Sequence, residues 1–229
     1  MREIVFDTET TGLSFAGGDR LVEIGCVELI HRVETGRTFH AYINPQRAMA
    51  AEAQAVHGLG DAFLADKPVF AAVVVDLLDF IGDAPLVAHN AGFDFSFLNG
   101  ELKACGRVEI ARERMVDTLQ LARTRHPGAK HTLDALCVRY GVDRSHRVLH
   151  GALLDAQLLA QVYVELTGGR QIGLGLAVEA VEVAATTVAI ARGEIRAARP
   201  HVASPEELAA HARFLATVKE PLWGASAFG

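Results

Sequence analysis

Apolar residues recur along the chain with two periods, one typical of strands and one typical of helices. Strand-like runs cover residues 2–7, 20–31, 38–43, 85–88 and 115–116, with residues 35–37 predicted as the turn into the third run. Helical spacing predicts helices over residues 48–56, 68–81, 92–103, 117–125, 132–140 and 151–166, the second with Pro68 at its first position. Three strands with short links, followed by helices alternating with short strands, predict a mixed sheet flanked by helices.

The first strand carries two acids, Asp7 and Glu9, just before a Thr-Thr-Gly turn. Residues two apart in a strand point to the same side, so both carboxylates are expected to project together from the end of the strand. Carboxylates this close repel each other unless one is protonated or a cation lies between them. On this stretch alone, two solvated acids at a strand end remain the alternative.

Two further acids and a histidine stand near the starts of later helices. Asp94 lies in the first turn of the helix after the fourth strand, and Asp155 lies one turn into the helix over residues 151–166. His150 and Asp155 would not share a helical face, because five helical residues rotate by roughly 500°. His150 is therefore expected in the loop before that helix, with its ring turned back over Asp155.

Four acids and one imidazole on converging elements favour metal chemistry, because buried carboxylates without cations are very costly. Hard divalent cations such as Mg²⁺ and Mn²⁺ take carboxylate oxygens as ligands. Two such ions roughly 3.5–4 Å apart stabilise the attacking and leaving oxygens of phosphodiester hydrolysis. A histidine with an unperturbed pKa near ~6.5 suits the general base that deprotonates the attacking water, and His150 is the candidate.

Composition and charge limit how such a protein would hold nucleic acid. The 229 residues carry a formal net charge of −6, yet residues 103–147 hold 10 Lys and Arg against 5 Asp and Glu. A locally basic wall can guide a phosphate backbone without giving tight non-specific binding, although ordinary exposed helix-face arginines are the alternative reading. Three scattered cysteines fit a reducing cytosol and argue against a zinc site. Glu179 and Glu182 interrupt the apolar run over residues 174–191, which argues against a membrane span.

Three motifs, FDTETTG, HNAGFD and HGALLD, resemble in order and spacing those of the DEDD 3′–5′ exonucleases, in the subtype with histidine. The resemblance covers about residues 1–168 and implies a ribonuclease H-like α/β fold. The sibling subtype has a Tyr three residues before the last acid, where this chain has Ala152. The resemblance implies that His150 is the base and that two divalent ions, Mg²⁺ or Mn²⁺, are bound by Asp7, Glu9, Asp94 and Asp155.

The motif VHGL over residues 56–59 looks like a loop of the proofreading epsilon subunits of bacterial DNA polymerase III. In that subfamily the Val-His pair contacts the terminal base and sugar, which implies a single-stranded 3′ end of DNA as substrate. Taken alone, His57 would be a helix-terminal histidine near the last carbonyls. The residues implied to contact substrate are Asp7, Glu9, Thr10, Val56, His57, Phe93 and Asp155.

The region after residue 168 is predicted to comprise a linker over residues 169–200 and a tail over residues 201–229. QIGLGL, residues 171–176, resembles the peptide by which bacterial proteins bind the beta sliding clamp. Gln171, Leu174 and Leu176 stand at its key places, and Leu176 replaces the usual Phe. In isolation these six residues would be read as linker.

The tail contains a helix start with a Ser204 cap, Pro205 at the first position and Glu207 at the third. Leu208 and Leu215 fall on one apolar stripe. A lone helix this short has no core of its own, so it either folds back on the first domain or docks on a partner. The segment 207–223, which includes Trp223, resembles the tail by which epsilon subunits hold the alpha (polymerase) subunit.

These features together predict a proofreading 3′–5′ exonuclease of a bacterial replicase, located in the cytoplasm and releasing 5′-dNMP. The expected partners are the alpha subunit and the beta sliding clamp, and the resemblance also allows a small theta-like subunit. One alternative is a related exonuclease acting on RNA or short oligonucleotides. Another is a mainly structural linker between polymerase and clamp, against which the intact acids and His150 argue.

Overall fold

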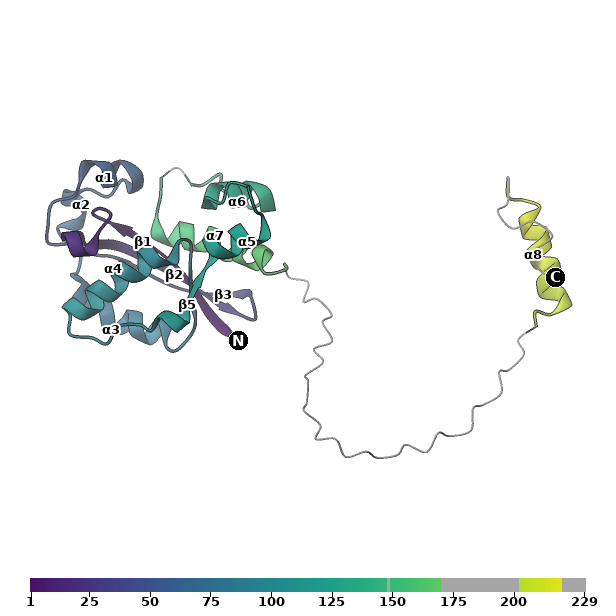
Figure 1. Ribbon diagram of the computed structural model, residues 1–229, viewed down its shortest axis with the longest axis horizontal. Helices are drawn as coiled ribbons and strands as arrows, with labels where there is room; N and C mark the ends of the chain where they lie inside the picture. The colour runs from purple at the N-terminus through teal and green to yellow at the C-terminus, as the bar shows by residue number, and fades with distance from the viewer. Residues whose placement is uncertain (148, 170–201, 220–229) are drawn as a thin grey trace, which may run out of the picture. The chain divides into compact units, whose positions relative to one another are not determined.

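The computed structural model describes residues 1–147, 149–169 and 202–219. The chain separates into two units, Met1–Leu176 and Ala177–Gly229, and each is described by itself. Figure 1 shows the first unit as a central sheet with helices packed around it. In the second unit the described residues form one helix, α8 (Pro205–Leu215).

Five strands form the sheet in the order β3-β2-β1-β4-β5. β1 (Arg2–Thr10) lies at its centre and pairs antiparallel with β2 (Leu21–Ile30) and parallel with β4 (Leu86–Ala88). β3 (Val33–Tyr42) is antiparallel to β2, and β5 (Met115–Asp117) is parallel to β4. The predicted antiparallel meander and mixed sheet are therefore confirmed.

Side-chain alternation along β1 divides the core into two layers. Ile4 and Phe6 face the layer of α3 (Phe70–Ile81) and α4 (Ala91–Ala104). Val5 faces the opposite layer, against α7 (Ala152–Leu166). Because odd-numbered residues of β1 share one face, Asp7 and Glu9 are on the side of α7.

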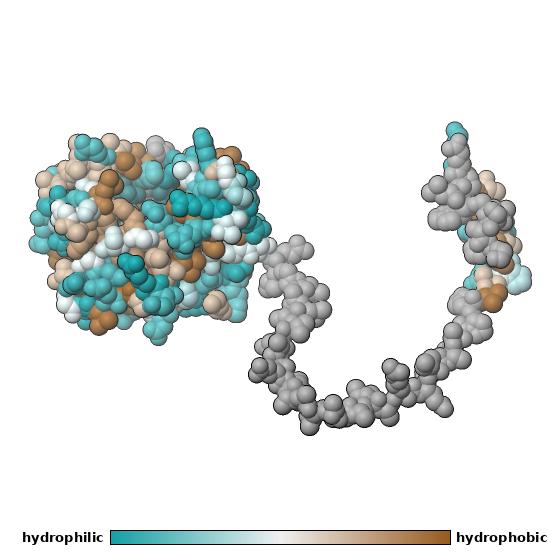
Figure 2. Space-filling view, viewed as in Figure 1, coloured by the Kyte–Doolittle hydropathy of each residue, from teal (hydrophilic) through white to brown (hydrophobic). Residues whose placement is uncertain are grey.

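The remaining helices complete the two ends of the first unit. α1 (Ala51–His57) and α2 (Asp61–Leu64) follow β3, and α5 (Thr118–Arg125) and α6 (Leu133–Tyr140) follow β5. Short 3-10 helices cover Phe15–Gly17 and Arg112–Arg114. α5 and α6 pack on α7 through a third apolar cluster. The view in Figure 2 shows a mainly hydrophilic surface with small apolar patches.

α8 begins as the sequence predicts. The Ser204 side chain accepts from the Glu207 N–H, the Glu207 carboxylate accepts from the Ser204 N–H, and Pro205 is the first helical residue. Leu208 is 49% exposed and Phe214 is 60% exposed, so these two apolar side chains of α8 are largely open to solvent. Among the described residues, no helix is long and apolar enough to span a bilayer.

Several predicted boundaries are wrong, including the start of the helix predicted over residues 48–56, which begins at Ala51. The turn between β2 and β3 is His31–Arg32, both with positive φ, which suits a tight two-residue hairpin. The predicted turn residue Gly36 lies instead within β3, where the pairing register shifts. α3 begins at Phe70, with Val69 as its cap, so Pro68 precedes the helix. β1 runs on to Thr10, which places Glu9 within the strand.

Candidate active site

The central strand brings two carboxylates to the end of the sheet. Asp7 pairs with Gly25 of β2 and Glu9 pairs with Glu23, so both acids have defined cross-strand neighbours. Glu9 is buried. The two acids face α7, which is the layer that carries Asp155.

Gly25 lets α7 approach β2 closely. A Cβ built on Gly25 would lie only 2.3 Å from both the Cα and the N of Leu153, in the first turn of α7. No side chain fits in that space, so the glycine is required by close backbone approach rather than by a turn. The contact holds the start of α7, and with it Asp155, over the strand end where Asp7 and Glu9 lie. A glycine inside a buried strand, such as Gly25, is the sequence signal that predicts such a close approach.

Asp94 reaches the same strand end from the other layer. It lies in the first turn of α4 and is buried. The Thr8 hydroxyl donates to Asp94 Oδ1 at 2.7 Å, which ties the helix to β1. Asn90, the residue before α4, adopts the left-handed conformation, and its N–H donates to Asp117 Oδ1 at 3.1 Å. Side chains from both layers therefore meet around the end of β1.

Burial and mutual repulsion raise the pKa values of these acids. Desolvation is the main cause for Glu9, whose pKa rises to about 8, with further contributions from the charges of Asp155 and Glu23. Burial raises the pKa of Asp94 to about 7, although the Thr8 hydrogen bond favours its charged form. The pKa of Asp7 is raised well above its usual range by burial and by the charges of Asp94 and Glu9. Such a group of carboxylates gains most from a bound cation.

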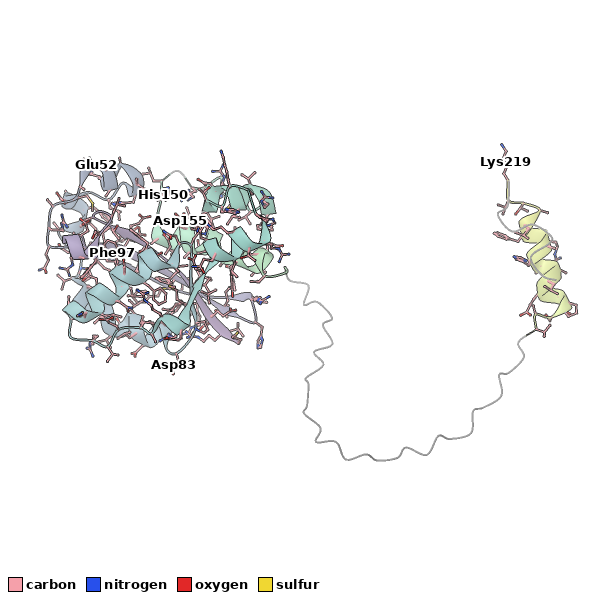
Figure 3. The ribbon with its side chains drawn as sticks, in the orientation of Figure 1. Glu52, Asp83, Phe97, His150, Asp155 and Lys219 are labelled. Carbon is pink, nitrogen blue, oxygen red and sulfur yellow. The ribbon has the colours of Figure 1, made fainter. Side chains whose placement is uncertain are left out.

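His150 lies in the loop before α7, as expected from the rotation of the helix, and its Nδ1 is 3.3 Å from Asp155 Oδ2. Figure 3 shows the two side chains near each other, between α1 and α6 in that view. One ligand atom each from Glu9, His150 and Asp155 lies within 4.8 Å of the others. This donor set of carboxylates and an imidazole fits a divalent cation. The backbone N–H of His150 donates to the Val56 carbonyl at 3.3 Å, which links this loop to the end of α1.

An apolar hollow of about 520 Å³ opens beside the acids, lined by Thr10, Val56, His57 and Phe93 among others. The Thr10 hydroxyl donates to the Gly12 carbonyl at 2.6 Å, and Val56 is 46% exposed. His57 is buried at the end of α1, and its Nδ1 accepts from the Leu59 N–H at 3.0 Å. Its Nε2 has no hydrogen-bond partner within the described part of the chain.

The hydrogen bonds of His57 specify which nitrogen is the donor. Burial lowers the pKa of His57, although the nearby Thr10 backbone opposes this, and the net shift favours the neutral ring. A neutral imidazole that accepts through Nδ1 carries its proton on Nε2. Nε2 is thus a buried donor beside the hollow, and a ligand oxygen would satisfy it.

Arg147 is the residue of the site that the sequence analysis missed. Its guanidinium donates to both oxygens of Asp155, from Nε at 2.6 Å and from an amino group at 2.7 Å. It also donates to Asp134 Oδ1 at 3.1 Å, and one of its amino groups lies 2.8 Å from His150 Nδ1 and 3.3 Å from His150 Nε2. Its side chain is only 8% exposed. The only sequence signal that pointed to Arg147 was the general excess of basic residues over residues 103–147.

A second hollow, of about 690 Å³, contains the acids themselves. Its walls include Arg123 of α5, His131 before α6 and His89 before α4. Part of the predicted basic wall therefore borders the acids. His89 accepts from or donates to the Thr118 hydroxyl through Nδ1 at 2.9 Å, which orders the turn where β4 ends.

Several predicted residues are elsewhere. Leu208 and Leu215 belong to α8 in the second unit. Gln171, Leu174, Leu176 and Trp223 lie outside the described residues, so their predicted roles stay predictions.

Comparison with known proteins identifies the family of this chain. A model of the family described as "Exonuclease" matches residues 4–163. A DNA polymerase III subunit epsilon of Salmonella typhimurium is 48% identical over 222 residues, covering 92% of this chain and 90% of the relative. The subunit of that name from Escherichia coli K12 is 44% identical over 221 residues, with the same two coverages, and one from Rickettsia felis is 52% identical over 185 residues, covering 80% of this chain and 81% of that relative. The chain belongs to the exonuclease family of DNA polymerase III epsilon subunits.

Solved structures extend the agreement to the fold. Exonuclease X in complex with 5′ overhanging duplex DNA is 27% identical, with a TM-score of 0.56 over 72% of this chain and 90% of that chain. The nuclease domain of 3′hExo, described as a DEDDh family member bound to rAMP, is 17% identical with a TM-score of 0.63 over 72% and 91% of the two chains. The predicted ribonuclease H-like exonuclease fold is confirmed. As an epsilon-family exonuclease the protein is a 3′–5′ proofreading enzyme, and exonucleases of the DEDDh type use divalent metals.

Proposed function

We propose that the four carboxylates at the end of β1 bind two divalent ions, Mg²⁺ or Mn²⁺, and that His150 is the general base for hydrolysis of the 3′-terminal phosphodiester. The observation that carries this is the meeting of ligand atoms from Glu9, His150 and Asp155 within 4.8 Å, beside half-buried Asp7 and buried Asp94. When bound, the ions supply the positive charge that stabilises the attacking and leaving oxygens. The product is a 5′-dNMP.

The acids, helices and loops of this chain prepare the site for that reaction. Thr8 orients Asp94 by its hydrogen bond, and the Gly25 contact holds the first turn of α7 over the strand. The Val56 carbonyl holds the His150 backbone, so the ring stays beside Asp155. His150 is half exposed, which leaves room for it to take a proton from water and pass it to solvent.

The hollow beside α1 is proposed to hold the terminal nucleoside of a single-stranded 3′ end of DNA. Its lining is mostly apolar, with few polar groups, as ligand pockets usually are. Phe93 and Val56 would contact the base, and Nε2–H of His57 would donate to a base or sugar oxygen. Thr10 lines the same hollow, although its hydroxyl is already bonded to the Gly12 carbonyl.

The assembly of the protein is proposed from its relatives' names and from its own C-terminal region. Those relatives are subunits of DNA polymerase III, and the matches to two of them cover 92% of this chain. α8 with Leu208 and Leu215, together with Trp223, is proposed to bind the alpha subunit. Residues 171–176 are proposed to bind the beta sliding clamp, and a small theta-like subunit is a further proposed partner.

The test is degradation of a 5′-labelled primer–template, with paired and mispaired 3′ ends, in the presence of Mg²⁺, of Mn²⁺ and of EDTA. The mispaired end is expected to be shortened faster, since a frayed end supplies single-stranded substrate. No product is expected in EDTA. An enzyme that degrades an RNA oligonucleotide faster than the matching DNA would favour the RNA-specific alternative.

The variant His150→Gln tests whether His150 acts as the general base or as a metal ligand. Turnover is expected to fall by roughly 10²–10⁴, the range for a lost general base, because glutamine cannot accept the proton. Mn²⁺ affinity, measured by calorimetry, is expected to stay within a few fold of wild type. The matched control is His146→Gln, in the same loop. Loss of Mn²⁺ binding in His150→Gln would instead identify the histidine as a metal ligand.

A further inference from the structure

One cation of the protein itself already occupies the acidic site. The guanidinium of Arg147 binds Asp155 through two parallel hydrogen bonds of 2.6 and 2.7 Å. Two-point pairing of this kind uses both carboxylate oxygens and is stronger than a single contact. Arg147 is almost buried, and its charge favours the ionised forms of Asp7 and Glu9.

The same guanidinium also engages the proposed base. An amino group of Arg147 lies 2.8 Å from His150 Nδ1. The same amino group lies 3.3 Å from His150 Nε2, so it contacts both nitrogens of the ring. Arginine has only donors and stays charged, so a fixed positive charge lies against both nitrogens of the proposed base. Arg147 therefore places one cation against both Asp155 and His150, the two groups that the proposed hydrolysis uses.

A second carboxylate, that of Asp134, offers the Arg147 guanidinium an alternative partner. Asp134 at the start of α6 accepts from the remaining amino group at 3.1 Å, and its side chain is 46% exposed. A guanidinium released from Asp155 can keep this partner, so its release does not leave an unpaired buried charge. Arg144 shares Asp134 at 3.0 Å but makes no hydrogen bond or ion pair to Asp155 among the described residues.

We propose that Arg147 holds the site in a resting state by competing with the divalent ion for Asp155. Binding of the ion displaces the guanidinium from Asp155 onto Asp134, and the same movement frees His150. Arg147 is in these terms a positioning residue, because it acts through Asp155 and His150. The inference rests on the proposed metal site. It adds that the Arg147 guanidinium must move away from Asp155 before the divalent ion can bind there.

The experiment compares full-length wild type with Arg147→Met, Arg147→Lys and the control Arg144→Met. Mn²⁺ affinity is measured by titration calorimetry at pH 8, and thermal unfolding is measured in EDTA. Removal of the competing charge is expected to tighten Mn²⁺ binding in Arg147→Met by about 10-fold, which is modest for two charges in contact. The metal-free protein is expected to melt about 4–10 °C lower, because a buried pair is broken.

The other variants separate competition from general charge effects. Arg147→Lys keeps a charge but cannot grip both oxygens, so its Mn²⁺ affinity is expected between those of wild type and Arg147→Met. This variant supplies the comparison if Arg147→Met does not fold without metal. Arg144→Met is expected to bind Mn²⁺ within about twofold of wild type, since an exposed charge is screened.

Three results would overturn the proposal. Unchanged or weaker Mn²⁺ binding in the Arg147 variants would show that the guanidinium does not compete with the ion. An equal increase in Mn²⁺ affinity in Arg144→Met would show that the effect comes only from the change in net charge. Wild type that binds no Mn²⁺ would remove the metal site itself, and the inference with it, whereas wild-type binding with unaltered variants would remove the inference alone.

Discussion

Individual carboxylates of this site are kept in an unfavourable environment. Glu9 is buried next to Asp155 and Glu23, and its pKa is raised to about 8, so its charged form destabilises the metal-free fold. The pKa values of Asp94 and Asp7 are raised as well. An acid that binds its proton more tightly when folded stabilises the fold at low pH, and that contribution is lost as pH rises toward the folded pKa.

The metal-free protein is therefore expected to lose stability between about pH 4.5 and about pH 8, the usual and the folded pKa of Glu9. Glu9→Gln is expected to flatten this dependence and to raise stability at pH 8 by about 2 kcal/mol or more. Thermal unfolding in EDTA at several pH values measures both effects. Asp79→Asn removes an exposed acid of α3 as a control. Parallel pH profiles for wild type and Glu9→Gln would contradict the assignment.

Sequence reasoning located the acids but not their cationic partner, for a physical reason. Asp7, Glu9, Asp94 and Asp155 stand next to strand ends and helix starts, where spacing fixes their direction. Arg147 lies in a loop without periodicity, so nothing local predicts which carboxylate its long side chain reaches. The donor nitrogen of His57 also depends on a backbone N–H two residues further on, which a pattern of residue types does not reveal.

At the level of elements, the sheet and most helices follow from the sequence because their apolar periods are clear. The hairpin between β2 and β3 does not. Gly36 was the natural candidate for a turn, yet His31 and Arg32 adopt positive φ and Gly36 lies where the pairing shifts. Register depends on which residues pair across the strands, and a turn signal alone does not specify it.

The contact between α7 and β2 is the element-scale feature that the site depends on most. In Gly25→Ala the new methyl group would lie 2.3 Å from α7 backbone atoms, so the helix must move. We expect a loss of about 1–3 kcal/mol in stability, the cost of overpacking, and a fall in turnover as Asp155 shifts. Denaturant unfolding and primer degradation measure the two.

Gly92→Ala is the matched control for that change. It lies in the first turn of α4, near Asp94, and a Cβ there meets nothing within 4 Å. Its stability is expected to be unchanged or higher by about 0.5–1 kcal/mol, since alanine favours helix. Full activity in a stable Gly25→Ala protein would show that the close approach does not position Asp155.

On the scale of the whole molecule, hydrolysis and assembly are proposed to lie in separate parts of the chain. The acids, His150 and both hollows lie within residues 1–169. The net charge of −6 disfavours unaided retention on DNA. Tethering to the polymerase would replace phosphate contacts by a high effective concentration at the primer end.

Truncation after Gly169 is expected to leave a soluble, active nuclease that no longer binds the alpha subunit. In the full chain, Trp223→Ala is expected to weaken that association by about 1–2 kcal/mol or more, as truncation of an aromatic anchor does. Calorimetry with the alpha subunit measures it, and Gln171→Ala is the control variant. Undiminished binding, or a lower melting temperature of the isolated Trp223→Ala chain, would indicate that the tail packs on its own domain.

The placement of Asp155 on α7 has a consequence for biosynthesis. The strand that carries Asp7 and Glu9 is translated before α7, which spans Ala152–Leu166 and is the last described element of the first unit. A nascent chain that ends before α7 lacks the fourth acid and the helix that covers Gly25. If the proposed site is correct, nuclease competence is acquired in one late step of translation, and a chain aborted before that step is released without the means to cut DNA.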